Sequence, residues 1–147
     1  MGSDANDRLV AYVGAAEGYE AAAGVLTPVA NVQHIAAEPS AVAAALVLAE
    51  GFLDASMKVH ISESMLSAAS RLRIISCATT GSDHISQGVA DERGIVVRTL
   101  RENPNVLQNL TPAAELSWML LMACARNLPA AVTHVQEGRW VREEFPG

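Results

Sequence analysis

The segment that most constrains the fold is RLRIISCA, residues 71–78, which is β-branched and nearly uniformly apolar. Such a run is typical of a strand that lies inside a parallel sheet and is covered on both faces. Further strands are expected at residues 8–15, 31–37 and 95–99, with helix-forming segments between them. Strands that alternate with helices predict right-handed βαβ crossovers, and therefore an α/β fold with a parallel sheet.

The ends of two helices carry local signals. Ser62 and Ser86 are each suited to the N-cap position, where a hydroxyl satisfies a free backbone N–H, and Gly94 is suited to end the second of these helices. The predicted helices cover residues 17–29, 63–70 and 87–93.

One segment is ambiguous. Residues 44–49, AALVLA, fit either a buried strand or a continuation of the helical turn that Pro39 opens, because periodicity cannot separate the two over so few residues. We favour a strand, and we expect residues 50–61 to form a loop that crosses to the next helix.

The last third of the chain changes character. Thr111 followed by Pro112 predicts a helix start, and the helix from Ala113 to Ala125 is apolar on nearly every face. Pro129 is expected to kink or restart it, with a second piece running to about Gly138. A helix that is apolar all round requires burial on all sides, so this one is expected to associate with a partner surface.

Composition excludes several classes of protein. Half of the 147 residues are apolar, and 16 acidic against 10 basic residues give a net charge of −6 without any basic run, so nucleic acid and anionic membranes are not expected partners. The apolar stretches are too short for a membrane span, and the polar start MGSDANDR is not expected to be a signal peptide. Cys77 and Cys124 lie in separate apolar runs, which favours reduced core residues and a cytoplasmic location.

Few catalytic motifs are present. A dinucleotide fingerprint starting at Gly14 would need a second glycine where Ala16 stands, so this glycine predicts a tight turn into the first helix. No phosphate-binding P-loop or GxSxG nucleophile turn occurs, and the four histidines lack metal-binding spacing, so no metal site is expected.

The turn TTGSDHI, residues 79–85, carries the main candidate site. It follows the clearest strand, and a glycine turn at the carboxyl end of a parallel strand can direct backbone N–H groups at a carboxylate. The alternative is a tight turn whose Asp83 satisfies the nearby amides, and the pattern alone favours this alternative.

A family resemblance adds to this interpretation. The stretches RLRIISCATTGSDHISQGVADERGIVV, TPAAELSWMLLMACARNLPAA and EGRW, in this order, resemble the D-isomer-specific 2-hydroxyacid dehydrogenases, which include phosphoglycerate, formate and phosphite dehydrogenases. The similarity covers roughly residues 44–147 and is weaker before them. In this family a flavodoxin-like substrate domain is split between the two ends of the chain, and a Rossmann domain that binds NAD is inserted between them.

The resemblance implies a domain organisation. Residues 1–110 are expected to form the N-terminal part of the substrate domain, a flavodoxin-like parallel sheet flanked by helices. Residues 111–147 are expected to form a long apolar helical arm that leads into an NAD-binding domain, which this sequence lacks.

The resemblance also implies site residues. The loop that holds the substrate carboxylate by backbone amides falls on Thr79, Thr80 and Gly81, and a further asparagine or main-chain contact falls on Asn109. Ala113 stands where many members carry a hydroxyl that meets the cofactor, so any cofactor contact is weakened. Ser86 replaces the usual Asp at the end of the GxDxID pattern, and a comparable helix cap is expected.

The resemblance places catalysis elsewhere. The family's catalytic Arg, Glu and His follow the GxGxxG, so no catalytic residue is assigned to this chain. NAD or NADP is expected to bind in the full-length family member, and neither is expected to bind tightly to this chain.

Two functional hypotheses follow. The leading one is the substrate-domain portion of an NAD-dependent D-2-hydroxyacid dehydrogenase, which takes a small 2-hydroxy or 2-oxo acid and is inactive alone. The alternative is a stand-alone small-carboxylate-binding or oligomerisation module, while a receiver-like domain lacks the acidic pair expected after its first strand. Both hypotheses are compatible with a homodimer. The homodimer is expected to form through Leu116, Trp118, Leu121 and Leu128.

Overall fold

The computed structural model describes residues 7–145. The chain divides into two compact units, with the boundary in the sequence between Pro104 and Asn105. The first unit alternates strands and helices along the chain. Its elements are β1 (Leu9–Val13), α1 (Ala16–Leu26), β2 (Asn31–His34), α2 (Pro39–Leu48), β3 (Gly51–Asp54), α3 (Glu63–Ala68), β4 (Ile74–Cys77), α4 (Gln87–Glu92), β5 (Val96–Arg98) and the 3₁₀ turn η2 (Leu100–Glu102).

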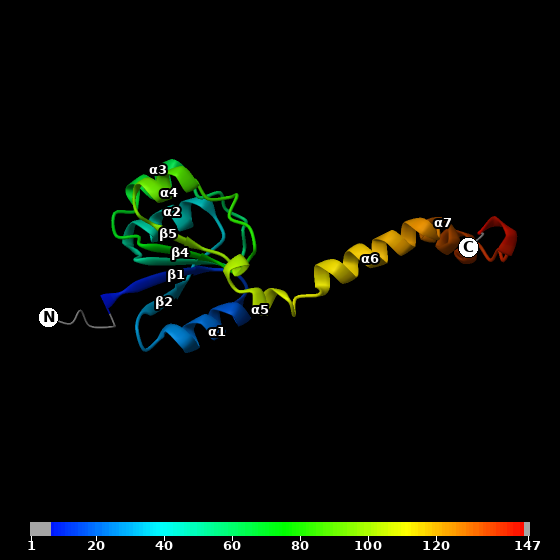
Figure 1. Cartoon of the computed structure of the whole chain (residues 1–147), viewed down its shortest axis with the longest axis horizontal. Helices are drawn as coiled ribbons and strands as arrows, with labels where there is room; N and C mark the ends of the chain where they lie inside the picture. The colour runs from blue at the N-terminus through cyan, green and yellow to red at the C-terminus, as the bar shows by residue number, and fades with distance from the viewer. Residues whose placement is uncertain (1–6, 146–147) are drawn as a thin grey trace. The chain divides into compact units, whose positions relative to one another are not determined.

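The strands of the first unit form one five-stranded sheet in the order β2-β1-β3-β4-β5, and every pair is parallel. This is the strand order of flavodoxin-type sheets, in which the connections reverse direction beside β1. Within this unit, Figure 1 shows α2, α3 and α4 on one face of the sheet and α1 on the other. The predicted α/β fold with a parallel sheet flanked by helices is confirmed.

The hydrophobic core lies between the sheet and the layer of α2, α3 and α4. Phe52 and Ile75 project from the sheet into it, and Leu46 and Leu66 meet them from the helices, all at most 2% exposed. Ile74 faces the other way and is 42% exposed. The expectation that both faces of this strand are covered is therefore wrong within the first unit, where helices bury only one face of β4.

The ambiguous segment is helical. Residues 44–49, favoured as a strand, lie largely in α2, whose first position is Pro39 and whose buried Val42, Ala45 and Leu46 follow helical spacing. The following residues, expected to be a loop, contain β3. The prediction failed because α2 is apolar on nearly all sides and so lacks a helical stripe, and because β3, with the sequence GFLD, contains no β-branched residue.

The helix caps differ from one another. Ser62 caps α3 as predicted, because its Oγ accepts a hydrogen bond from Met65 N at 3.3 Å. Ser86 makes no such bond to α4, so the expected cap is absent there. Gly94 ends α4 in the left-handed region, with φ +65°, as predicted. Thr111 occupies the N-cap position of its helix, but its hydroxyl donates to Glu115 Oε1 instead of capping.

The second unit is helical. It contains α5 (Pro104–Leu107, whose first residue belongs to the first unit), α6 (Pro112–Ala125), α7 (Leu128–Gln136) and the 3₁₀ turn η3 (Arg142–Glu144). The helix is interrupted between α6 and α7 at Asn127, which adopts the left-handed conformation, so the predicted restart near Pro129 is confirmed. No residue of α6 is buried within its own unit. Among residues 7–145, no helix is long and apolar enough to cross a membrane.

The two serines provide a matched test of helix capping. Ser62→Ala should lower the free energy of unfolding by about 1 kcal/mol, because the N–H of Met65 loses its acceptor. Ser86→Ala should have little effect, since that hydroxyl caps nothing. Urea denaturation of both variants measures the two changes, and equal losses would contradict the assigned caps.

Candidate functional site

The loops that follow β3 and β4 begin side by side. The two strands pair in parallel with Asp54 opposite Cys77, so both loops leave the carboxyl edge of the sheet at the same level. The loop after β4 contains Thr79, Thr80 and Gly81. It is fixed at its start because the Thr79 carbonyl accepts a hydrogen bond from Leu100 N at 2.8 Å, and the Thr79 hydroxyl donates to the carbonyl of Gly81 at 3.0 Å.

The backbone N–H groups of this loop are free of hydrogen bonds to residues 7–145. In the part of the chain that the structure describes, no acceptor is hydrogen-bonded to the N–H of Thr79, Thr80 or Gly81. Asp83 accepts no hydrogen bond from the described residues either, so the alternative in which its carboxylate satisfies the turn amides is wrong. Consecutive N–H donors at the carboxyl end of a parallel strand are suited to bind an anion.

A buried pair joins the two loops. Asp54, the last residue of β3, is 1% exposed, and its Oδ2 accepts a hydrogen bond from His84 Nε2 at 3.0 Å. Its Oδ1 accepts from Ser56 N at 2.8 Å, from Met57 N at 2.9 Å and from the Ser56 hydroxyl at 3.1 Å. The His84 side chain is 10% exposed, and its Nδ1 is buried without a partner among residues 7–145.

The loop after β3 contains a strained residue. Met57 has φ +54°, in the left-handed region that a side chain with a Cβ rarely adopts. Such a conformation costs about 1 to 2 kcal/mol and persists only where the surroundings impose it. Here the hydrogen bond from Met57 N to the Asp54 carboxylate holds the conformation.

The electrostatics of this edge exclude a cysteine nucleophile. Cys77 ends β4 and is buried, and its pKa is raised from 9.0 to about 11, first by burial and second by the negative charge of Asp54. The thiol therefore stays protonated at neutral pH, whereas a nucleophilic cysteine requires the thiolate. Within the described residues, no group of three His, Cys, Asp or Glu side chains could hold a metal ion.

The turn after β1 is filled by aromatic side chains. The Tyr12 hydroxyl donates to the carbonyl of Ala15 at 3.0 Å, and a Cβ on Gly14 or Gly18 would collide with this hydroxyl. The ring of His34 stacks on Tyr19, and its Nε2 donates to the carbonyl of Gly14 at 2.9 Å. Close packing thus accounts for both glycines, and the space where a pyrophosphate would approach is occupied.

The predicted site residues are distributed over both units. Thr79, Thr80 and Gly81 lie in one loop of the first unit, whereas Asn109 and Ala113 belong to the second. The Asn109 side chain donates to the carbonyl of Asn105 at 2.8 Å, and the carbonyl of Ala113 accepts from the Ser117 hydroxyl at 2.7 Å. The binding roles of Asn109 and Ala113 stay predictions. Asp54 and His84 were not predicted from the sequence; the only local signal was that His84 lies in the turn that carries the candidate site.

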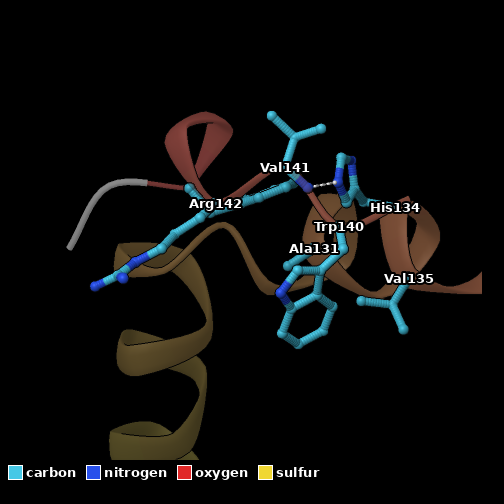
Figure 2. Close-up of a pocket in the computed structure, with 7 residues that line it drawn as sticks. Ala131, His134, Val135, Trp140, Val141 and Arg142 are labelled. Atoms are coloured by element: carbon cyan, nitrogen blue, oxygen red, sulfur yellow. Dashed lines mark hydrogen bonds between the residues drawn. The ribbon is translucent and has the colours of Figure 1, made fainter. Parts of the chain in front are cut away.

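The second unit has a hollow of its own, about 330 Å³ in volume. Figure 2 shows His134 beside it, with Nε2 accepting a hydrogen bond from Val141 N at 2.8 Å. His134 is 3% exposed, and Phe145 packs edge-on against its ring. The histidine therefore ties the residues after α7 back onto that helix. The lining residues are Ala131, His134, Val135, Trp140, Val141, Arg142 and Phe145.

Comparison with known proteins identifies a family. The model of the D-isomer specific 2-hydroxyacid dehydrogenase catalytic domain matches residues 23–106, which is more than half of the chain. The D-3-phosphoglycerate dehydrogenase of Synechocystis sp. is 37% identical over 87 residues, which are 59% of this chain and 15% of that relative. The corresponding protein of Archaeoglobus fulgidus is 36% identical over 90 residues, which are 61% of this chain and 16% of that relative.

A solved structure has the same fold. The NAD-dependent formate dehydrogenase from Staphylococcus aureus, in complex with NAD, superposes with a TM-score of 0.74 at 18% identity and covers 93% of this chain and 44% of its own. The chain thus spans less than half of that protein, and it matches a still smaller part of the two curated relatives.

The raised pKa of Cys77 predicts a loss of stability in alkali. The unfolded chain releases the thiol proton near pH 9, whereas the folded chain retains it to about pH 11, so the free energy of unfolding should fall across this window, by up to about 2 kcal/mol. Cys77→Ala should weaken this pH dependence, and Cys124→Ala should keep it. Denaturation at several pH values from 8 to 11 tests the prediction, and identical profiles for wild type and Cys77→Ala would contradict it.

Proposed function

The chain belongs to the D-isomer-specific 2-hydroxyacid dehydrogenase family, and we propose that its first unit binds the carboxylate of a small 2-hydroxy or 2-oxo acid. The observation that carries the proposal is that the consecutive backbone N–H groups of Thr79, Thr80 and Gly81 have no acceptor in the described part of the chain. These groups follow β4 at the carboxyl edge of the parallel sheet, where α/β proteins bind ligands.

The proposed role of the loop is to hold and orient the substrate. Main-chain N–H donors can bind a carboxylate without a charged side chain. Because the carboxylate is ionised, these hydrogen bonds are charge-assisted and are among the stronger ones in proteins. A carboxylate held in this way fixes the position of the neighbouring carbon, which is the one that gains or loses hydride in this family. Orientation of this kind lowers the entropic part of the barrier to transfer.

Within residues 7–145, neither the turn after β1 nor Ala113 supports binding of a nicotinamide cofactor. The turn after β1 has Ala16 where the dinucleotide fingerprint needs its second glycine, and the Tyr12 hydroxyl occupies the space inside this turn. Ala113 has no hydroxyl that could meet a cofactor. We therefore propose that hydride transfer with NAD or NADP depends on a separate nucleotide-binding domain. Residues 1–110 would then supply the substrate side, and residues 111–147 would form an apolar helical arm that leads into that domain.

A second candidate function is supported by the apolar side chains of the second unit. Four of them are about half exposed or more: Leu116 (53%), Trp118 (66%), Leu121 (57%) and Leu128 (48%). Exposed apolar surface of this kind is a common mark of a protein interface. We propose that these residues mediate homodimerisation, either in a dehydrogenase or in a stand-alone oligomerisation module.

Carboxylate binding is tested by titrating the ¹⁵N-labelled chain with pyruvate and following the amide signals by NMR. The signals of Thr79, Thr80 and Gly81 should shift, and Gly81→Pro, which removes one N–H, should weaken binding by about tenfold or more. Thr80→Ala should bind normally, because only the backbone of that residue takes part.

Two controls accompany the pyruvate titration. Methyl pyruvate, which carries no charge, should shift the same signals little. Addition of NAD and a 2-hydroxy acid to the 147-residue chain should give no turnover, and measurable oxidation would contradict the proposed dependence on a separate domain. Absence of any shift with pyruvate would refute carboxylate binding by this loop.

Self-association is tested by sedimentation. The wild-type chain should dimerise, and Leu121→Glu should shift it toward monomer because a carboxylate cannot be buried cheaply in an apolar interface. Val25→Glu is the matched control, since Val25 is an apolar residue of α1 that is 76% exposed. A wild-type chain that stays monomeric at high concentration would contradict the proposed interface.

A further inference from the structure

We infer that Asp54 and His84 are positioning residues for the carboxylate-binding loop, an inference that rests on the proposed function of that loop. Asp54 ends β3, and His84 lies three residues after Gly81. The hydrogen bond between their side chains therefore ties the segment with the free N–H groups to the neighbouring strand. Neither residue is assigned a contact with the substrate.

The segment is anchored at both ends, and the N–H groups of Thr80 and Gly81 between them have no acceptor among residues 7–145. At its start, the carbonyl of Thr79 is bonded to Leu100 N at 2.8 Å. At its end, the carbonyl of His84 accepts from Ile61 N at 2.7 Å, and the His84 ring is bonded to Asp54. A loop whose ends are fixed before the ligand arrives loses less conformational entropy on binding, so these anchors favour affinity.

The pair also stabilises the opposite loop. Asp54 Oδ1 holds the N–H groups of Ser56 and Met57, and Oδ2 depends on His84 for its donor. Because Asp54 is 1% exposed, removal of the imidazole leaves a buried carboxylate oxygen without that donor. The two loops must then move for water to reach this oxygen, and the segment with the free N–H groups loses one of its anchors.

The contacts of His84 make the inference testable. The bond from Nε2 to Asp54 is the ring's hydrogen bond in the described structure, since Nδ1 has no partner there. A glutamine amide can donate the same bond, whereas leucine fills similar space and donates nothing. His84→Gln and His84→Leu therefore separate the hydrogen bond from the volume of the ring. His60→Leu serves as a control, because His60 is an exposed histidine before α3.

The experiment is a pyruvate titration of the wild-type chain and the three variants, followed by NMR, with thermal unfolding to verify that each variant is folded. His84→Leu should raise the Kd by about tenfold or more. His84→Gln should stay within about threefold of the wild type, and His60→Leu should leave the Kd unchanged. If His84→Leu does not fold, His84→Asn replaces it, since its amide is one carbon shorter than that of glutamine and reaches Asp54 less well.

The outcomes separate the inference from the function on which it rests. Normal binding by folded His84→Leu, or by its replacement His84→Asn, would overturn the inference and leave the proposed function in place. Equal weakening in His84→Gln and His84→Leu would also overturn it, because ring volume would then matter instead of the bond. A wild-type chain that does not bind pyruvate would overturn the proposed function and the inference together.

Discussion

The hydrogen-bonded register of β3 against β4 is the constraint on which the rest of the first unit depends. Parallel pairing sets Gly51 opposite Ile74 and Asp54 opposite Cys77, so both strands end at the same level. Burial of one face of these strands under α2, α3 and α4 prevents a slip of one residue, which would turn Phe52 and Ile75 out of the core. The meeting of the two loops follows from this register.

The sequence predicted elements that carry their own local signal. β4 was found because its run is β-branched, nearly uniformly apolar and followed by a glycine turn, and Gly94 marked the end of α4. β3 was missed because GFLD contains no β-branched residue and ends in an acid; its pairing with β1 and β4 identifies it as a strand. Such pairing is a property of the tertiary fold. The caps show the same limit, since Ser62 and Ser86 are the same residue type and only the surrounding backbone distinguishes them.

The sequence likewise indicated only part of the candidate site. The loop at Thr79–Gly81 is contiguous, so a strand followed by a glycine turn marked it as a candidate, although the pattern alone favoured a tight turn and the family resemblance supplied its proposed role. The bond between Asp54 and His84 joins residues thirty positions apart, and each residue taken alone looked like an ordinary polar side chain. The pair is important because it is buried, and the burial of these residues depends on the tertiary fold, which the sequence alone does not show.

The proposed carboxylate site at Thr79, Thr80 and Gly81 has an evolutionary consequence, because its donors are main-chain N–H groups. A ligand site built from main chain is inherited through backbone shape, so the side chains on it can drift without loss of recognition. Selection then acts most strongly on the residues that hold the shape, which lie away from the ligand. Searches that score side-chain identity at contact positions will underrate such a site, whereas comparison of backbone geometry will retain it.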